Sequence, residues 1–108
     1  MKTYDKAYFI AKFEAIPTHL WHTGGFVNKE IPEKMCALGH CGWRNGNQTT
    51  EELEEGRVLD VIIHDGTGTY VGDINDGHDP RFQQPFAKDR ILAALKSFPD
   101  DNNKQADV

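Results

Sequence analysis

The clearest structural signal in the sequence lies between two prolines near its C-terminal end. Pro85 suits the first turn of a helix, and Pro99 follows the point where that helix would stop. Between them one face is apolar at helical spacing, through Ile91, Leu92, Leu95 and Phe98. We therefore expect a last helix whose apolar face packs on a core supplied by the rest of the chain.

Three earlier segments also indicate helices. Residues 3–15 carry a helical apolar stripe, with Thr3 as the expected N-cap and Pro17 after the end. A short helix is expected from about residue 35, in the segment "MCALGHCGW", whose glycines suggest that another backbone packs closely there. Thr49 and Glu52 fit a capping box, which predicts a helix that runs to about Arg57.

Residues 58–75 are open to two interpretations. Val58, Val61, Ile62 and Ile63 are β-branched, and such residues favour a strand. The alternative is one longer helix that uses Leu53, Val58, Leu59 and Ile62. We favour a strand over 58–64, a turn at 65–68 and an antiparallel strand over 69–75. The predicted fold is α+β: one compact domain over residues 1–99, with about four helices and a small antiparallel sheet, and a disordered polar tail at 100–108.

Charge and composition exclude some classes of protein. The 108 residues carry a net charge of −5, with 17 acidic against 12 basic side chains and no basic stripe, so we expect no direct nucleic-acid partner. No apolar run approaches the roughly 20 residues that a membrane helix needs. The N-terminal segment does not resemble a signal peptide, and we expect a cytoplasmic protein without a membrane partner.

Cysteine and histidine residues raise the possibility of a zinc site. Cys36 and His40 are four residues apart, His19 and His22 three apart, and thiolate and imidazole are good zinc ligands. Cys41, His64 and His78 lie elsewhere in the chain. These spacings match no regular structural zinc pattern, so we expect no cofactor and keep a zinc-stabilised domain as an alternative.

Nucleophilic catalysis is a second alternative, centred on Cys36. A cysteine at a helix N-terminus has a lowered pKa, and His64 or His78 could serve as its base, oriented by Asn75 or Asp76. The residues around Cys36 are apolar, however, and burial would raise the pKa of its thiol. A cysteine-dependent hydrolase or transferase therefore stays an alternative interpretation.

Ligand binding is favoured by three groups of polar and aromatic residues. In "INDG", residues 74–77, Asn75 and Asp76 could present an amide and a carboxylate to a ligand, although turn chemistry explains them equally well. Trp21, flanked by His19 and His22, could stack on a flat ligand. Lys88 and Arg90, at the start of the last helix, could hold an anion.

Three motifs together resemble a known family. They are "CALGH" at 36–40, which follows Trp21, "INDG" at 74–77 and "AKDRILAAL" at 87–95. The chain is similar over most of residues 10–98 to a family of short uncharacterised proteins of bacteria, phages and prophages, which has no established activity. The resemblance implies that Cys36, Gly39, Asn75, Asp76 and Arg90 belong to one assembly. That assembly is either a pocket or a structural unit in which Asn75 and Asp76 cap the helix at 36 and Arg90 pairs with Asp76.

The sequence thus predicts a small non-enzymatic binding protein. A phage-like setting suggests a host-directed role, in which the protein sequesters a small nucleotide-like ligand or blocks a host protein. The expected ligand-binding residues are Trp21, His22, Cys36, His40, Asn75, Asp76 and Arg90.

Overall fold

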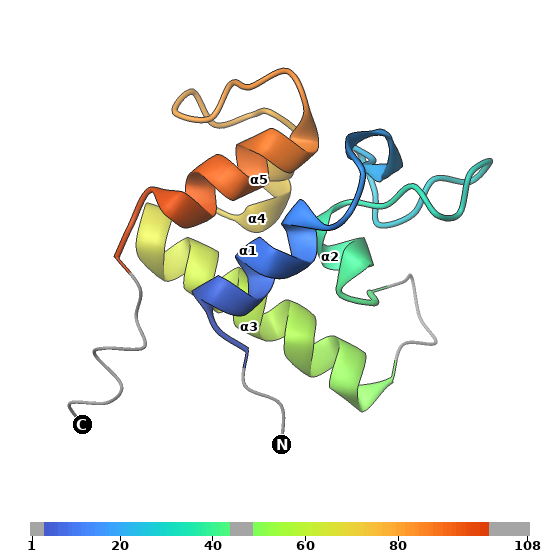
Figure 1. The fold of residues 1–108 in the computed structure, drawn as a ribbon, viewed down its shortest axis with the longest axis horizontal. Coiled ribbons are helices and arrows are strands. Elements are labelled where there is room, and N and C mark those ends of the chain that lie inside the picture. The colour runs from blue at the N-terminus through green and yellow to red at the C-terminus, as the bar shows by residue number, and fades with distance from the viewer. Residues whose placement is uncertain (1–3, 44–48, 100–108) are drawn as a thin grey trace.

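The computed structural model describes residues 4–43 and 49–99. Over these residues the chain forms five α-helices and one short 3-10 helix (Figure 1). In chain order they are α1 (Lys6–Glu14), η1 (Thr18–Leu20), α2 (Ala37–His40), α3 (Thr50–Thr67), α4 (Val71–Asn75) and α5 (Ala87–Lys96). The predicted cap Thr3 and the predicted tail at 100–108 lie outside the described residues; α1 is capped instead by Asp5, whose carboxylate accepts from Tyr8 N–H at 2.7 Å.

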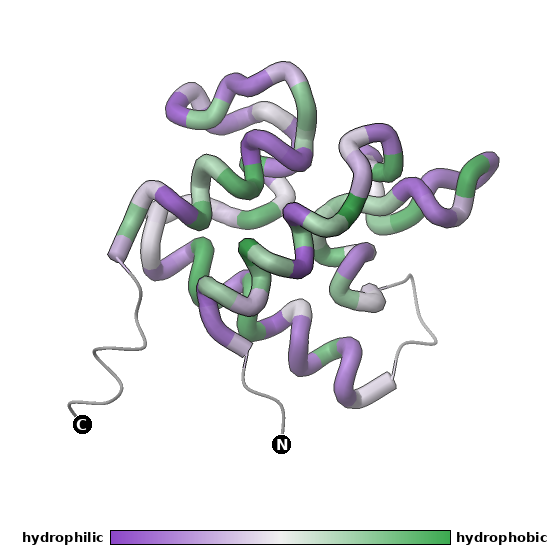
Figure 2. The backbone as a smooth tube through the Cα atoms, in the orientation of Figure 1, coloured by the Kyte–Doolittle hydropathy of each residue, from purple (hydrophilic) through white to green (hydrophobic). Residues whose placement is uncertain are grey.

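The core lies where α1, α3, α4 and α5 meet. α5 packs against both α1 and α4, and α3 packs against all three. The last helix is present as the sequence predicted, and its apolar face is buried. The largest apolar side chains that are almost fully buried are Phe9, Phe13, Leu59, Ile63, Val71, Ile74, Ile91 and Leu95. In Figure 2 the N-terminal half of α3 is mainly hydrophilic, whereas its C-terminal half, which carries Leu59 and Ile63, supplies the apolar contacts.

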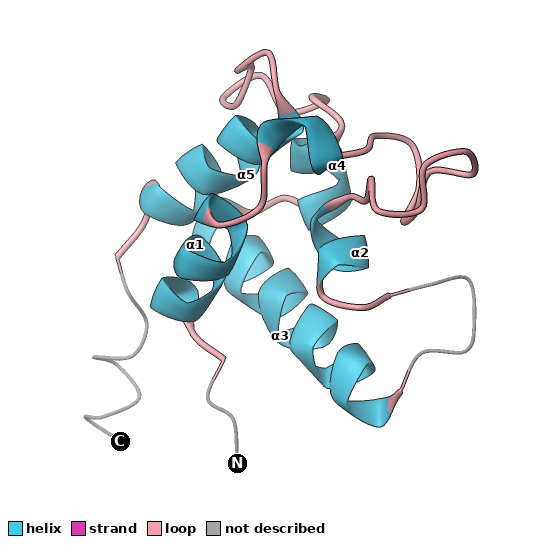
Figure 3. Ribbon diagram, turned by 45° about the vertical axis from the view of Figure 1, so that its right-hand side comes forward, coloured by secondary structure: helices cyan, strands magenta, loops and turns pink. Residues whose placement is uncertain are grey.

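The expected antiparallel sheet is absent from the described residues. Helices account for 54% and strand or bridge positions for 3%, so the α+β prediction is wrong and the domain is helical (Figure 3). Residues 58–64, predicted as a strand, lie inside α3, and residues 69–75 contain α4. The number of helices is accordingly higher than the four expected.

Helical periodicity explains this difference. Glu55, Leu59 and Ile63 follow one another at intervals of four residues, and all three are buried on the same side of α3. The capping box predicted at Thr49 and Glu52 is formed in both directions. Gly68 ends the helix in the left-handed region, at φ 80°, where glycine is favoured. Burial along one helical face outweighs the weak preference of β-branched residues for strands.

A looped segment joins η1 to α2 and extends to one side of the helices (Figure 1). Its two ends lie together, because His22 N–H donates to Met35 C=O at 2.9 Å and Met35 N–H to Leu20 C=O at 3.0 Å. Cys36 N–H donates to Phe26 C=O at 3.2 Å, which brings the middle of the segment against the start of α2. No helix in the described part of the chain is both long and apolar enough to cross a bilayer.

Candidate binding pocket

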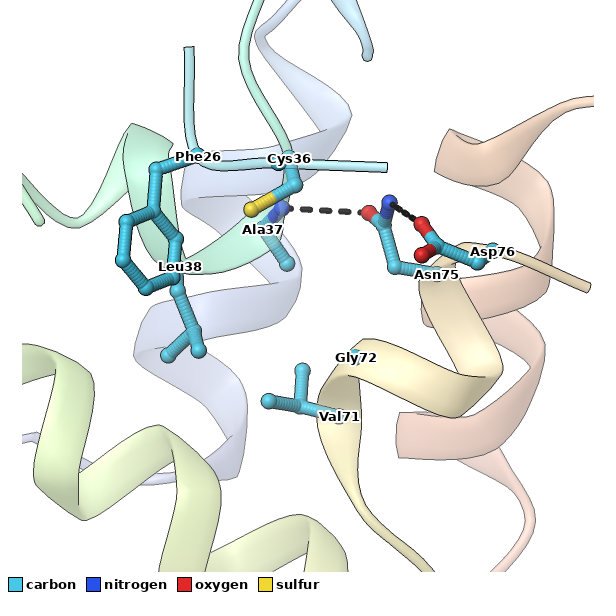
Figure 4. Close-up of a pocket in the computed structure, with 9 residues that line it drawn as sticks. Phe26, Cys36, Ala37, Leu38, Val71, Gly72, Asn75 and Asp76 are labelled. Carbon is cyan, nitrogen blue, oxygen red and sulfur yellow. Dashed lines mark hydrogen bonds between the residues drawn. The ribbon is translucent and has the colours of Figure 1, made fainter. Parts of the chain in front are cut away.

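A pocket of about 180 Å³ lies between α2 and α4. Nine residues line it: Gly25, Phe26, Cys36, Ala37, Leu38, Val71, Gly72, Asn75 and Asp76 (Figure 4). They come from the looped segment, from the start of α2 and from α4, three parts of the chain that are far apart in sequence. Three of the expected binding residues, Cys36, Asn75 and Asp76, are therefore brought together.

Asn75 holds these parts in place. Its side chain is 1% exposed, and its Oδ1 accepts from Ala37 N–H at 3.1 Å, in the first turn of α2. Its Nδ2 donates to His22 C=O at 2.8 Å and to Asp76 Oδ1 at 3.0 Å. The predicted capping of the helix at 36 by Asn75 is confirmed. The amide is engaged in structure, so Asn75 forms part of the pocket wall.

Asp76 is half-buried beside Asn75 and supplies the pocket's one carboxylate. Its Oδ1 accepts from Gly24 N–H at 3.1 Å as well as from Asn75. Oδ2 makes no hydrogen bond to the described residues, and Asp76 does not cap α2. One carboxylate oxygen is thus fixed by two donors, while the other has no donor among the described residues.

Cys36 is buried and precedes the first residue of α2. Its Sγ accepts from Gly39 N–H at 3.4 Å. Burial raises the pKa of the Cys36 thiol above its ordinary value; hydrogen bonds from nearby backbone N–H groups lower it in part, and the charge of Asp76 raises it. The thiol is therefore held neutral, which disfavours a nucleophilic role.

The histidines proposed as bases for Cys36 have other neighbours. His64 on α3 stacks on Tyr70, with ring centroids 5.0 Å apart, and His78 Nδ1 lies 3.9 Å from Asp73 Oδ1. Neither lines the pocket. The arrangement of cysteine, histidine and amide expected for a hydrolase is not assembled there.

The apolar walls are Phe26, Leu38 and Val71, which sequence reasoning did not single out. Gly39 lets α2 approach Phe26: a Cβ added at Gly39 would lie 2.1 Å from Phe26 C=O. The close backbone packing expected from the glycines of this segment is thus confirmed at Gly39. Gly72 is different, since a Cβ there would meet nothing within 4 Å, and its place on the pocket wall has no signal in the sequence.

The pocket lining does not include the tryptophan and the histidines that were considered for ligand or metal binding, which are Trp21, His19, His22 and His40. Trp21 is 5% exposed and packs on Phe13 and His40, with ring centroids 5.3 Å and 4.9 Å away. It belongs to the core and offers no face to a flat ligand.

His40 Nε2 lies 2.9 Å from Leu20 C=O, and His19 is exposed. Across residues 4–43 and 49–99, no three His, Cys, Asp or Glu side chains are grouped so that they could hold a metal ion, so the zinc alternative gains no support.

Arg90 is buried, but its partners differ from the one expected. Its guanidinium donates to Asn75 C=O at 2.6 Å from Nη2, and to Gln84 C=O at 2.7 Å from Nη1. Nε contacts the carbonyl oxygens of Ile74 and Asn75, both at 3.2 Å. The predicted pairing of Arg90 with Asp76 is therefore wrong: Arg90 closes the C-terminal end of α4. Lys88, the other residue considered for an anion, donates to Glu14 C=O at 3.0 Å.

A second buried polar cluster was not predicted. Glu55, 6% exposed on α3, accepts from Tyr8 Oη at 3.1 Å and pairs with Lys12 on α1. Burial raises the pKa of the nearby Cys41 thiol, and the charge of Glu55 raises it further. A sequence signal exists, since Glu55 precedes Leu59 and Ile63 at the same four-residue spacing. The cluster ties α1 to α3, and its carboxylate is satisfied within the protein.

Comparisons of this chain with protein-family models, with curated proteins and with solved structures find no match. The functional interpretation therefore depends on the geometry of the pocket.

Proposed function

We propose that this chain is a non-enzymatic binding protein that holds one side chain of a partner protein in the α2–α4 pocket. The observation that supports it is the pocket itself: apolar walls from Phe26, Leu38 and Val71, with polar atoms concentrated at Asn75 and Asp76 (Figure 4). A few fixed polar groups in an apolar surround are typical of binding sites. The raised pKa of Cys36 supports binding over nucleophilic catalysis.

The size of the pocket favours a protein partner over a nucleotide-like ligand. Pockets for drug-sized molecules usually enclose about 300–1,000 Å³, whereas this one encloses about 180 Å³. A buried apolar cavity of roughly 150 Å³ accommodates a benzene molecule. The space thus suits one side chain, and a host protein, as a phage-like setting suggests, is the partner class to test first.

Gly72 allows a direct test. Because a Cβ at Gly72 would meet nothing within 4 Å, the side chain of Gly72→Leu can begin without a clash and is expected to extend into the pocket that Gly72 lines. The control is Asp73→Leu, which places the same side chain on the neighbouring exposed position of α4, outside the lining. Benzyl alcohol serves as a neutral probe of the size of one aromatic side chain.

The measurement is titration of the ¹⁵N-labelled protein with benzyl alcohol, followed through amide chemical shifts. We expect saturable shifts at Ala37, Gly72 and Asn75 in the unaltered protein and in Asp73→Leu. Gly72→Leu is expected to bind at least roughly tenfold more weakly, which corresponds to about 1.4 kcal/mol. An absence of shifts in the unaltered protein, or equal binding by Gly72→Leu, would contradict the proposal.

A further inference from the structure

We infer that the α2–α4 pocket selects an arginine side chain, presented by a basic segment of the partner protein. This rests on the proposed function and adds the chemistry of the occupant. The aliphatic stem would lie between the apolar walls, and the guanidinium would meet Asp76 (Figure 4).

The first argument is the distribution of charge in the pocket. Among its nine lining residues, Asp76 is the one acidic side chain, and none is basic. The next acidic residue on α4, Asp73, is exposed one turn before it. Together with the net charge of −5, this gives the opening a negative field that attracts a cation and repels an anion.

The second argument concerns the hydrogen bonds of Asp76. Gly24 and Asn75 both donate to Oδ1, which fixes the orientation of the carboxylate. Oδ2 receives no donor from the described residues, so a purely apolar occupant would cover it without supplying one. Covering a polar atom in this way costs free energy, whereas a cationic N–H group would satisfy it.

The third argument distinguishes arginine from lysine. Arginine carries a planar, weakly hydrated guanidinium that stacks on aromatic rings and pairs well with carboxylates. Phe26 forms one wall of the same pocket in which Asp76 supplies the charge. An ammonium group is a strongly hydrated point charge and gains less from an aromatic wall.

The test compares two probes of the same shape. n-Butylguanidinium copies the arginine side chain together with its Cα carbon, and n-butylurea is its neutral counterpart. On the unaltered protein we expect n-butylguanidinium to shift the amides of Ala37, Gly72 and Asn75 and to bind roughly tenfold more tightly than n-butylurea, as for one hydrogen bond to a charged group.

Two variants test whether the preference for n-butylguanidinium over n-butylurea depends on the carboxylate of Asp76. Asp76→Asn keeps an oxygen that can accept from Gly24 and Asn75 but removes the charge, and it is expected to abolish the difference between the probes. Asp73→Asn removes the same charge from the same helix outside the lining, and it is expected to retain most of the difference. The comparison of probes on the unaltered protein needs no variant to fold.

Two peptides test whether the pocket accepts an arginine that is part of a polypeptide. They are acetyl-Gly-Arg-Gly-amide and the same peptide with citrulline in place of arginine. Preferential binding of the arginine peptide, lost in Asp76→Asn, is the result we expect. Binding of n-butylguanidinium without the arginine peptide would overturn a protein source. If benzyl alcohol binds but the paired probes do not differ, the arginine inference fails while the proposed function stands; if no probe binds, both fail.

Discussion

At the scale of single residues, Asn75 does the most to shape the site. One buried amide caps α2 through Ala37 N–H, holds the looped segment through His22 C=O and orients Asp76. The pocket walls come from the same three parts of the chain. The shape of the pocket and the stability of the fold therefore depend on the same side chain.

We predict that Asn75→Ala destabilises the protein by about 2–4 kcal/mol, because it leaves the buried Ala37 N–H and the partly buried His22 C=O without a partner. Urea unfolding followed by circular dichroism measures this change. Asn75→Asp is the companion variant: it keeps an acceptor for Ala37 N–H, but it loses the donor and places a second carboxylate beside Asp76. A loss below about 0.5 kcal/mol for Asn75→Ala, the range of ordinary surface changes, would contradict the structural role given to this amide.

Single residues also explain which features of the site could be predicted from the sequence and which could not. The capping of α2 by Asn75 was expected because its position in "INDG" and the family resemblance placed it beside residue 36. The partner of Arg90 was missed, since opposite charges suggested Asp76, and no pattern showed that residues 71–75 form a helix whose last carbonyl groups accept from Arg90. The apolar walls depend on the path of residues 22–35, which local periodicity does not determine.

At the scale of secondary structure, the sequence was informative about where helices start and stop. The capping box at Thr49 predicted the start of α3 correctly, and the prolines around α5 predicted the position of that helix. The error over 58–64 arose because a short β-branched run fits a strand and a buried helix equally well. Gly68 was the signal for the longer helix, because many helices end at a glycine in the left-handed region, and Gly68 ends α3 in this way.

α4 is a helix of five residues, and Arg90 of α5 satisfies its C-terminal carbonyl groups. Lysine cannot form the same set of bonds, because it has one ammonium group in place of a planar fork. We predict that Arg90→Lys lowers the free energy of unfolding by about 1–3 kcal/mol and accelerates hydrogen exchange in α4.

Arg57→Lys makes the same chemical change on the exposed face of α3 and serves as the control for Arg90→Lys. Its expected effect is within about 0.5 kcal/mol. Hydrogen exchange measured by mass spectrometry reports α4 directly. Equal effects of the two variants would show that the carbonyl bonds of Arg90 contribute little.

At the scale of the whole molecule, the two thiols link stability to pH. Cys36 and Cys41 flank α2, both are buried, and burial raises the pKa of each. In the unfolded chain they ionise near the ordinary cysteine pKa of about 8.5. Above that pH the unfolded state binds fewer protons than the folded state, so stability is complete below it and falls as the pH rises.

We predict that the free energy of unfolding decreases above about pH 8.5, by up to about 1.4 kcal/mol per pH unit for each thiol. Urea unfolding between pH 7 and 10 measures the slope. Cys41→Ala removes one thiol and should make the slope shallower, which separates the cysteine contribution from that of tyrosine and lysine. An equal slope in the unaltered protein and in Cys41→Ala would contradict the assignment of the pH dependence to the Cys41 thiol.

The open space at Gly72 affects how the pocket of such a protein can change during evolution. Asn75 and Asp76 are fixed by hydrogen bonds, but a Cβ at Gly72 would meet nothing within 4 Å, so a side chain can begin there without a clash. Substitutions there would alter which partners fit and leave the scaffold unchanged. On the proposed function, a change at this single position is expected to alter the partner while the same helices form.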